Sequence, residues 1–195
     1  MRLAIRSGPN MNDSSQVIRC PWAEGDPLMQ DYHDNEWGIP VWDAHALFER
    51  LILEGMQAGL SWRLVLKRRP AMRRAFFAFD AERLARATED DQRRWLNDLS
   101  LIRNRAKIAS VIANARAYLA LEDPVAYFWS FVDGTPILGE WRSASEVPSQ
   151  TDESRAMSKA LKGRGFKFVG PTICYALMQS AGLVNDHLLD CQFRQ

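Results

Sequence analysis

Apolar residues recur at helical spacing along most of the chain. The clearest stripe lies within about Arg105–Leu121, where one face carries Ile108, Val111, Ile112, Ala115 and Leu119. This three- and four-residue spacing predicts a long amphipathic helix with one buried side. A similar stripe predicts a helix from Ala44 to about Gln57, which Asp43 can cap.

Capping residues and helix breakers divide the rest of the chain into further short helices. Ser61 can cap the helix WRLVLKRR, which is expected to end near Pro70, and a separate helix is expected over Met72–Phe79. The other expected boundaries are Asp80 and Thr88 as caps of two short helices, Asp123-Pro124 before VAYFWSFV, Thr151 before a helix to Leu161–Lys162, and Gly170-Pro171 before TICYALMQSA with Gly182 after its end.

Two stretches lack a regular period. Residues 20–40 are rich in Pro, Gly, Asp and Trp, and only a short helix near Pro27–His33 is expected there. Residues 133–150 carry turn residues throughout and are expected to form a loop. Because strand patterns are nearly absent, the expected fold is all-α with roughly eight to ten short helices.

Composition adds few constraints. The apolar fraction of 47% and the formal net charge of +1 are ordinary for a soluble globular protein. No run could span a membrane, no secretory signal is visible, and the odd count of three cysteines favours a reducing, cytoplasmic location. We expect residues 1–18 to form a flexible tail and residues 19–195 a single domain of two closely packed helical lobes.

Positive charge is clustered despite the nearly neutral total. Basic residues gather at positions 67–69, 73–74, 103–107 and 162–167. Such patches are compatible with binding to a nucleic-acid backbone. A solvated helix face produces the same pattern, so the clusters alone do not decide between the two.

Two cysteine–histidine pairs at opposite ends of the chain could bind a metal. Twelve residues separate Cys20 from His33, and three separate His187 from Cys191. Thiolate and imidazole are the usual ligands of tetrahedral zinc, and four of them would close a structural site that joins the two ends. Spacing alone leaves open that these are two buried cysteines and two ordinary histidines.

One carboxylate among aromatic residues indicates a possible ligand pocket. Glu54 ends the apolar helix LFERLILEG, and Gly59, Leu60 and Trp62 follow it closely. A carboxylate beside flat aromatic rings suits a planar, polar or cationic ring, and nucleic-acid bases stack on such faces. The alternative is a solvated glutamate beside tryptophans of the core.

The segment LSLIRNRAK, which precedes the longest expected helix, carries the basic residues Arg103, Arg105 and Lys107. A helix-hairpin-helix element joins two helices by a tight turn whose N–H groups meet a phosphate, and nearby basic side chains add charge. Such a turn usually contains glycine, whereas this one has Ser100. A plain interhelical loop is therefore the alternative.

Several long motifs in the same order resemble the DNA-3-methyladenine glycosylase I family. They are RCPW, DPLMQDYHDNEWGIP, LFERLILEGMQAGLSW, LIRNRAKI, ALKGRGFKFVGPTICYALMQSAGLVNDH and the closing His187-x3-Cys191, and together they cover about residues 19–191. The resemblance implies an all-α helix-hairpin-helix glycosylase fold. It also implies monofunctional hydrolysis of the N-glycosidic bond of 3-methyladenine in alkylated DNA, within base excision repair.

The resemblance further implies roles for individual residues. Glu54 would be the catalytic carboxylate of the base pocket, and Gly59 and Leu60 would press against the duplex at the flipped-out nucleotide. The other implied positions are the pocket aromatics Trp22, Tyr32 and Trp62, the DNA-contacting residues Arg103, Arg105 and Lys107, and the ligands of one structural Zn²⁺, Cys20, His33, His187 and Cys191. Four protein ligands leave no open position for a metal-bound water.

Three positions depart from the family pattern. Met29 stands where another member has tyrosine, and Ser100 and Ala106 replace glycines of the hairpin region. The expected partners are alkylated double-stranded DNA and free 3-methyladenine as product, with no membrane and a monomeric protein. No lysine matches the nucleophile of strand-cleaving relatives, so lyase activity is not expected.

The chemistry of this substrate determines what the pocket must do. 3-Methyladenine in DNA is positively charged and leaves as a neutral base, so selection of the base matters more than acid catalysis. We expect an ionised Glu54 to attract the cation and to accept hydrogen bonds from its exocyclic amine, while Trp62 and Tyr32 stack on the ring. Cation–π attraction favours the methylated base over adenine by about 0.5–2 kcal/mol. Leu60 would fill the gap left in the stack.

Two other classes of protein are compatible with the same sequence. A non-catalytic DNA-binding or lesion-sensing module of this fold would bind DNA but release no base. A zinc-stabilised helical interaction protein would lack the salt-dependent DNA binding that phosphate contacts produce.

Overall fold

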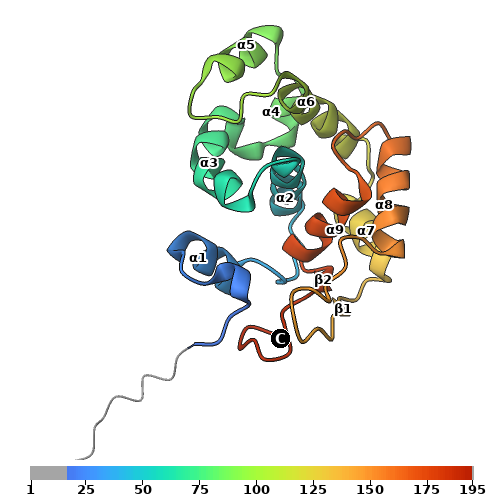
Figure 1. Cartoon of the computed structure of the whole chain (residues 1–195). Helices are drawn as coiled ribbons and strands as arrows, with labels where there is room; N and C mark the ends of the chain where they lie inside the picture. Colours follow the sequence, from blue (N-terminus) through green and yellow to red (C-terminus); the bar gives the residue numbers. More distant parts are fainter. Residues whose placement is uncertain (1–16, 195) are drawn as a thin grey trace, which may run out of the picture.

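The computed structural model describes residues 17–194, which form nine α-helices and three short 3-10 helices (Figure 1). The all-α prediction is thereby confirmed, whereas the tail expected over residues 1–18 lies almost wholly outside the described residues. The helices are η1 (Pro21–Ala23), α1 (Pro27–Asn35), α2 (Ala44–Gln57), α3 (Trp62–Ala75), η2 (Phe77–Phe79), α4 (Ala81–Ala85), α5 (Glu89–Asn97), α6 (Arg105–Leu119), α7 (Pro124–Trp129), η3 (Ser130–Val132), α8 (Asp152–Gly163) and α9 (Pro171–Ser180).

Side-chain caps determine where most of the α-helices begin. An oxygen of the capping side chain accepts a hydrogen bond from a backbone N–H of the first turn, which has no partner within the helix. The predicted caps Asp43, Ser61, Asp80, Thr88 and Thr151 all make this bond, as do Asp26, Asn104 and Asp123. The boundaries expected for α2, α6, α8 and α9 accordingly agree with the observed ones to within two residues.

The prediction that a helix ends near Pro70 is wrong, because α3 continues through this residue. Proline removes one backbone hydrogen bond from a helix. Val65, Leu66 and Met72, on either side of the proline, are all buried, so core packing holds both halves of the helix in place. The helix ends instead before Phe77–Phe79, where three successive φ angles of 52°, 55° and 60° turn the chain in the left-handed sense.

The stretch expected to be only loop contains a short strand. β1 (Ile137–Leu138) pairs in parallel with β2 (Val184–Asn185). Two residues are too few to show an alternating pattern, so no strand could be predicted there. The pairing attaches residues 133–150 to the segment that follows α9.

Helix α2 lies at the centre of the fold and contacts α3, α6, α7 and α9 (Figure 1). Every residue from Leu47 to Met56 is buried, including the charged residues Glu49, Arg50 and Glu54. A helix buried on all sides must find partners within the protein for its charged groups. No helix among the described residues is long and apolar enough to cross a membrane.

The two ends of the described chain lie on the same side of the molecule, the N-terminal end below α1 and the C-terminal end near the strands (Figure 1). The Gln192 N–H donates to the Ile18 carbonyl at 3.0 Å, and the Gly38 N–H donates to the Gln179 carbonyl at 2.9 Å. These bonds join the segment around η1 and α1 both to the C-terminal segment and to the end of α9.

Gly182 lies where the chain after α9 crosses the segment after α1. Its φ angle is +69°, and a Cβ atom at this position would lie 2.3 Å from both the Ile39 carbonyl carbon and the Pro40 nitrogen. Any other residue would meet backbone that has little room to move. The crossing therefore requires glycine for two separate reasons.

We predict that Gly182→Ala lowers the free energy of unfolding by about 3 kcal/mol or more, because it adds a backbone clash to a left-handed conformation. Thermal unfolding would show a decrease in Tm of about 6 °C or more. Gly163→Ala is the matched control, since a Cβ there meets nothing within 4 Å. Equal effects of the two substitutions would contradict this account of the crossing.

Candidate functional site

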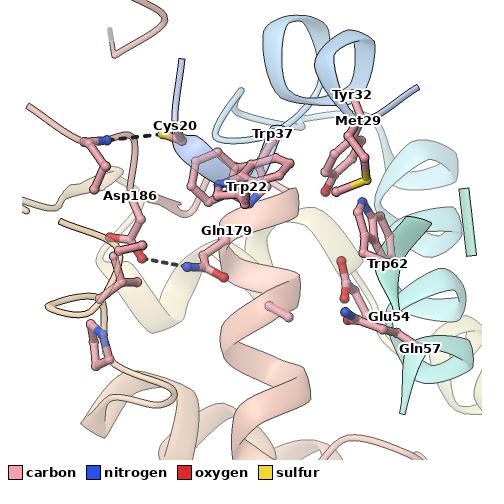
Figure 2. A pocket seen from close by; sticks show the side chains of 15 residues that line it. Cys20, Trp22, Met29, Tyr32, Trp37, Glu54, Gln57, Trp62, Gln179 and Asp186 are labelled. Carbon is pink, nitrogen blue, oxygen red and sulfur yellow. Dashed lines mark hydrogen bonds between the residues drawn. The ribbon is translucent and has the colours of Figure 1, made fainter. Parts of the chain in front are cut away.

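A cavity of about 430 Å³ lies between α1, the end of α2, the start of α3 and α9 (Figure 2). It brings together the four residues that the sequence assigns to a pocket, Trp22, Tyr32, Glu54 and Trp62. The other lining residues are Cys20, Met29, Trp37, Gln57, Ala144, Val147, Pro148, Ala176, Gln179, Asp186 and Leu188.

Glu54 lies in the last turn of α2 and is only 2% exposed, so the solvated alternative is wrong. Burial raises the pKa of this carboxyl to about 8, although the Ser180 hydroxyl and the Arg50 charge oppose the shift. Its Oε2 atom has no hydrogen-bond partner among the described residues. Burial thus favours the protonated form of Glu54 in the free protein.

Trp62 begins α3 and is half-buried beside Tyr32. The two ring centroids are 5.1 Å apart, and the ring planes are inclined at 54°. The Trp62 Nε1 atom is buried and has no partner among the described residues. Met29 lines the cavity beside these rings, so this departure from the family pattern lies in the pocket wall.

A network of charged residues packs against the Tyr32 ring. Arg50 forms an ion pair with Glu36, and its guanidinium lies 5.8 Å from the centre of the Tyr32 ring. Arg69 donates to Glu36 at 2.7 Å and to Glu49 at 2.6 Å, which joins α2 and α3 to the end of α1. No sequence pattern predicts this network, because its partners are far apart in the chain.

The side of the cavity opposite Glu54 contains Gln179 and Asp186 (Figure 2). Asp186 is 2% exposed and accepts hydrogen bonds from Trp141, Tyr175 and Gln179. Asp186 therefore joins the loop of residues 133–150, which carries Trp141, to α9, which carries Tyr175 and Gln179. The sequence contains two hints of this polar side of the cavity, a glutamine within the apolar helix α9 and an aspartate next to His187, and neither was predicted to line a pocket.

The chain makes a tight turn over residues 57–60, which we call the wedge turn. The Leu60 N–H donates to the Gln57 carbonyl at 2.6 Å. Ala58 has φ −40° and ψ 113°, and Gly59 has φ +73°, which are the angles of a type II turn. Gly59 is exposed and Leu60 is 37% exposed, so both residues lie on the surface next to the cavity.

The segment between α5 and α6 is ordered by an aspartate. Asp98 accepts hydrogen bonds from the Ser100 N–H at 2.8 Å and from its hydroxyl at 2.5 Å. Neither Ser100 nor Ala106 has a positive φ, so the backbone conformation does not require glycine at these positions. Arg103 and Arg105 are exposed here, as a surface contact would need.

Lys107 differs from the other two expected DNA contacts. Its side chain is buried, and its Nζ atom donates to the carbonyls of Met56 and Ala58 at 2.7 and 2.6 Å. Burial lowers the pKa of this ammonium group. The structure thus turns Lys107 towards the end of α2 and away from the surface where we expected it.

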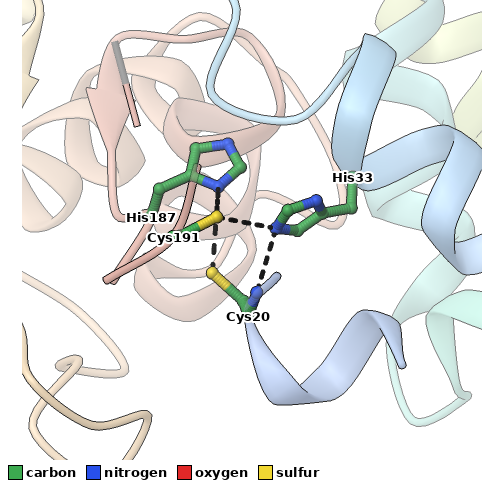
Figure 3. A group of neighbouring side chains, drawn as sticks. All are labelled: Cys20, His33, His187 and Cys191. Atoms are coloured by element: carbon green, nitrogen blue, oxygen red, sulfur yellow. Dashed lines mark hydrogen bonds between the residues drawn. The ribbon is translucent and has the colours of Figure 1, made fainter. Parts of the chain in front are cut away.

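The two cysteine–histidine pairs meet in one buried cluster (Figure 3). The possible ligand atoms of Cys20, His33, His187 and Cys191 all lie within 4.8 Å of one another. The Cys191 Sγ atom is 3.5 Å from His33 Nε2 and 3.4 Å from His187 Nδ1, and Cys20 Sγ is 3.8 Å from the same His187 nitrogen. This set could hold a metal ion.

In both imidazoles the ring nitrogen that faces away from the cluster already has a hydrogen-bond partner. The His33 Nδ1–H donates to Asp34 at 2.8 Å, and the His187 Nε2–H donates to the Trp37 carbonyl at 3.1 Å. Carboxylate and carbonyl oxygens can only accept, so each ring directs its unprotonated nitrogen into the cluster. Outer partners of this kind commonly orient metal-binding histidines. The residues present therefore fit a metal ion.

Comparison with known proteins agrees with this geometry. The family model described as "Methyladenine glycosylase" matches residues 22–195. DNA-3-methyladenine glycosylase 1 of Escherichia coli (strain K12) is 51% identical over 177 residues, which are 89% of this chain and 95% of that protein.

Solved structures give the same result. A crystal structure of a 3-methyladenine DNA glycosylase I has a TM-score of 0.88 at 50% identity, covering 90% of this chain and 98% of the other. The Staphylococcus aureus 3-methyladenine DNA glycosylase I, solved to explain 3-methyladenine recognition, has a TM-score of 0.87 at 35% identity, covering 91% and 96%. Sequence and structure both match along nearly the whole chain, and the chain therefore belongs to the methyladenine glycosylase family.

Proposed function

We propose that the cavity beside Glu54 receives the flipped-out base on which this chain acts as a monofunctional DNA-3-methyladenine glycosylase of base excision repair. One observation carries the assignment of the site. The Glu54 Oε2 and Trp62 Nε1 atoms are buried, have no partner among the described residues, and belong to side chains that line one cavity. Buried polar atoms are normally hydrogen-bonded, so an acceptor and a donor here suit the polar edge of a purine.

The charge of the methylated base explains how Glu54 could select it. A protonated carboxyl is stable in the buried site, because burial raises its pKa to about 8. A cationic base would favour loss of this proton, since the ion pair offsets the desolvation of the carboxylate. Neutral adenine provides no such charge. The expected ionised Glu54 thus belongs to the substrate complex.

The aromatic residues would provide the faces for stacking. Because the Trp62 and Tyr32 rings are inclined at 54°, they form a corner rather than two parallel plates. One ring can stack on the base while the other meets its edge. Trp22 and Trp37, whose ring centroids are 5.0 Å apart, extend the aromatic wall towards the Cys/His cluster.

The duplex would lie against the wedge turn and the segment between α5 and α6. Leu60 is the exposed apolar side chain nearest in sequence to Glu54, and it would occupy the space left by the flipped nucleotide. We propose that α5, residues 98–104 and α6 form the helix-hairpin-helix element. Its exposed Arg103 and Arg105 would contact the phosphates.

Strand cleavage is not part of the proposal. None of the described residues that line the cavity is a lysine, and the Lys107 ammonium is bound to two carbonyls. The charge of the substrate already weakens the glycosidic bond, so water can attack the sugar once the base is held. A single domain over residues 19–195 acting as a monomer completes the proposal.

We propose that Cys20, His33, His187 and Cys191 hold one structural zinc ion. Zinc–sulfur and zinc–nitrogen bonds of about 2.3 and 2.0–2.1 Å in a tetrahedron place sulfur and nitrogen about 3.6 Å apart. Three of the four sulfur–nitrogen distances, 3.4, 3.5 and 3.8 Å, are close to this value. With four protein ligands the ion would stabilise the fold and take no direct part in hydrolysis.

We predict that Glu54→Gln and Trp62→Ala each slow the release of 3-methyladenine from alkylated DNA by about 10-fold or more, through loss of the carboxylate and of the stacking face. Single-turnover assays of released base would measure this effect. The matched controls are Glu140→Gln and Trp42→Ala, which alter exposed residues outside the cavity. Wild-type rates for folded forms of both pocket variants would overturn the assignment.

We predict that Glu54→Gln raises Tm at pH 9 by about 4 °C or more, and that this gain shrinks as the pH falls and disappears below the ordinary pKa of 4.5. The raised pKa means that the folded protein binds more protons than the unfolded chain between the ordinary pKa of 4.5 and about 8. Stability is therefore lost as the pH rises through this window. A thermal-shift difference that is the same at pH 5 and pH 9 would contradict this prediction.

We predict that the purified protein contains about one tightly bound zinc, and that its removal by a chelator lowers Tm by about 10 °C or more before it alters the chemical step. Cys20→Ala should lose the metal, whereas Cys174→Ala should keep it, since Cys174 is buried outside the cluster. Elemental analysis showing less than about half an equivalent would exclude the site.

A further inference from the structure

Lys107 is a buried cation whose partners are both backbone carbonyls. Its side chain is 5% exposed, and its Nζ atom lies 2.7 Å from the Met56 oxygen and 2.6 Å from the Ala58 oxygen. Among the described residues Lys107 forms no ion pair with an acidic side chain, and burial lowers the pKa of its ammonium group. Burying an ammonium group is unfavourable, so its place between these two carbonyls calls for an explanation.

The two carbonyls have different positions in the chain. The Met56 carbonyl belongs to the last turn of α2, where carbonyls have no partner within the helix and attract positive charge. The Ala58 carbonyl belongs to the central peptide of the wedge turn. Lys107 thus joins the first turn of α6, which Asn104 caps, to the segment that follows Glu54.

The orientation of the central peptide decides the type of turn. Type I and type II turns differ mainly by a rotation of this peptide of about 180°. In the observed type II form the Ala58 carbonyl faces the Lys107 ammonium. In the type I form the Gly59 N–H would face it, and two positive groups would oppose each other. Lys107 therefore favours type II, which in turn requires the positive φ of Gly59, +73°.

The same peptide then directs its other end outwards. A trans peptide points its C=O and N–H in opposite directions, so the Gly59 N–H points away from Lys107. Both Gly59 and Leu60 are exposed, and no Cβ at position 59 would meet an atom within 4 Å. The outer face of the turn thus offers a backbone donor next to an exposed leucine, a combination that suits a phosphodiester beside a gap in stacked bases.

We propose that Lys107 is a positioning residue for base excision, which holds the wedge turn in its type II form so that Leu60 and the Gly59 N–H meet the strand that carries the flipped base. This inference rests on the proposed function, because it assumes that DNA lies against this turn. Lys107 would act through the Ala58 peptide and would not touch DNA. Arg103 and Arg105, in contrast, are exposed and free to contact phosphates directly.

Lys107→Met tests the proposal, because methionine retains the apolar stem and removes the ammonium group. We expect kcat/KM on alkylated duplex DNA to fall about 10-fold or more, while the affinity for free 3-methyladenine, measured by tryptophan fluorescence, changes less than about 2-fold. Lys159→Met, at an exposed position on α8, should change neither quantity. Equal losses in excision and in base affinity, or full activity of Lys107→Met, would overturn the proposal.

Salt dependence distinguishes positioning from direct contact. A lost phosphate contact reduces the slope of log K against log salt by about 1. We expect this reduction for Arg105→Met and an unchanged slope for Lys107→Met. A reduced slope for Lys107→Met would mean that its ammonium group binds DNA, and the proposal would be wrong.

The stability of double variants tests the turn without any activity. Gly59→Ala should lower Tm by about 2–4 °C in the wild-type chain, since alanine disfavours a positive φ. In the Lys107→Met background the turn is free to adopt type I, and we expect at most half of that decrease. Equal decreases in both backgrounds would refute the proposal.

Two results would require a change of measurement: a Lys107→Met variant that does not fold, and a wild-type chain that releases no base. If Lys107→Met does not fold, Lys107→Leu, which also removes the ammonium group and leaves no donor, replaces it in all three measurements. If the wild-type chain releases no methylated base, the proposed function fails, whereas the Gly59→Ala comparison still decides whether Lys107 controls the turn.

Discussion

Contact between the two ends of the chain is the interaction on which the site depends. The cavity wall that carries Trp22 and Tyr32 comes from a segment with only η1 and α1, which has too little apolar surface to fold alone. The His187 ring from the other end of the chain holds this segment, with its centroid 4.6 Å from that of Trp37 and 4.5 Å from that of His33. Because the entropic penalty of loop closure grows slowly with length, one buried cluster can close even this long loop.

The buried charged residues of helix α2 fall into two kinds, those paired with other charges and one that faces the cavity. Glu49 and Arg50 are buried with partners, and the network that they form fixes α1 and α3. Glu54, one turn further on, is equally buried, and one of its oxygens has no partner. An unpaired acid in the core disfavours folding, and such a feature is typical of sites where binding or catalysis opposes stability.

Much of the fold could be predicted because its signals are local. Caps such as Asp43 and Thr151 act on neighbouring N–H groups, so helix starts can be read from short stretches, whereas Pro70 was misjudged because tertiary packing outweighed it. The site depends on long-range contacts that no local pattern contains. The spacing of the cysteines and histidines left open whether they form a metal site, the family resemblance favoured such a site, and the structure brings the four residues together in a cluster that could hold a metal ion. Lys107 was assigned to the surface because its burial depends on the end of another helix.

The placement of the Cys/His cluster at the two ends of the chain also has a consequence for the order in which the protein is completed during synthesis. Cys20 and His33 leave the ribosome early, while His187 and Cys191 follow only after all the α-helices from α2 to α9. During that interval Cys20, which is 1% exposed in the folded protein, lacks the other members of the cluster, and its exposed thiol is open to oxidation. The aromatic wall can then close only over a core that is already folded. The cavity, which is lined by residues from Cys20 to Leu188, therefore cannot be complete before the last part of the chain has been made.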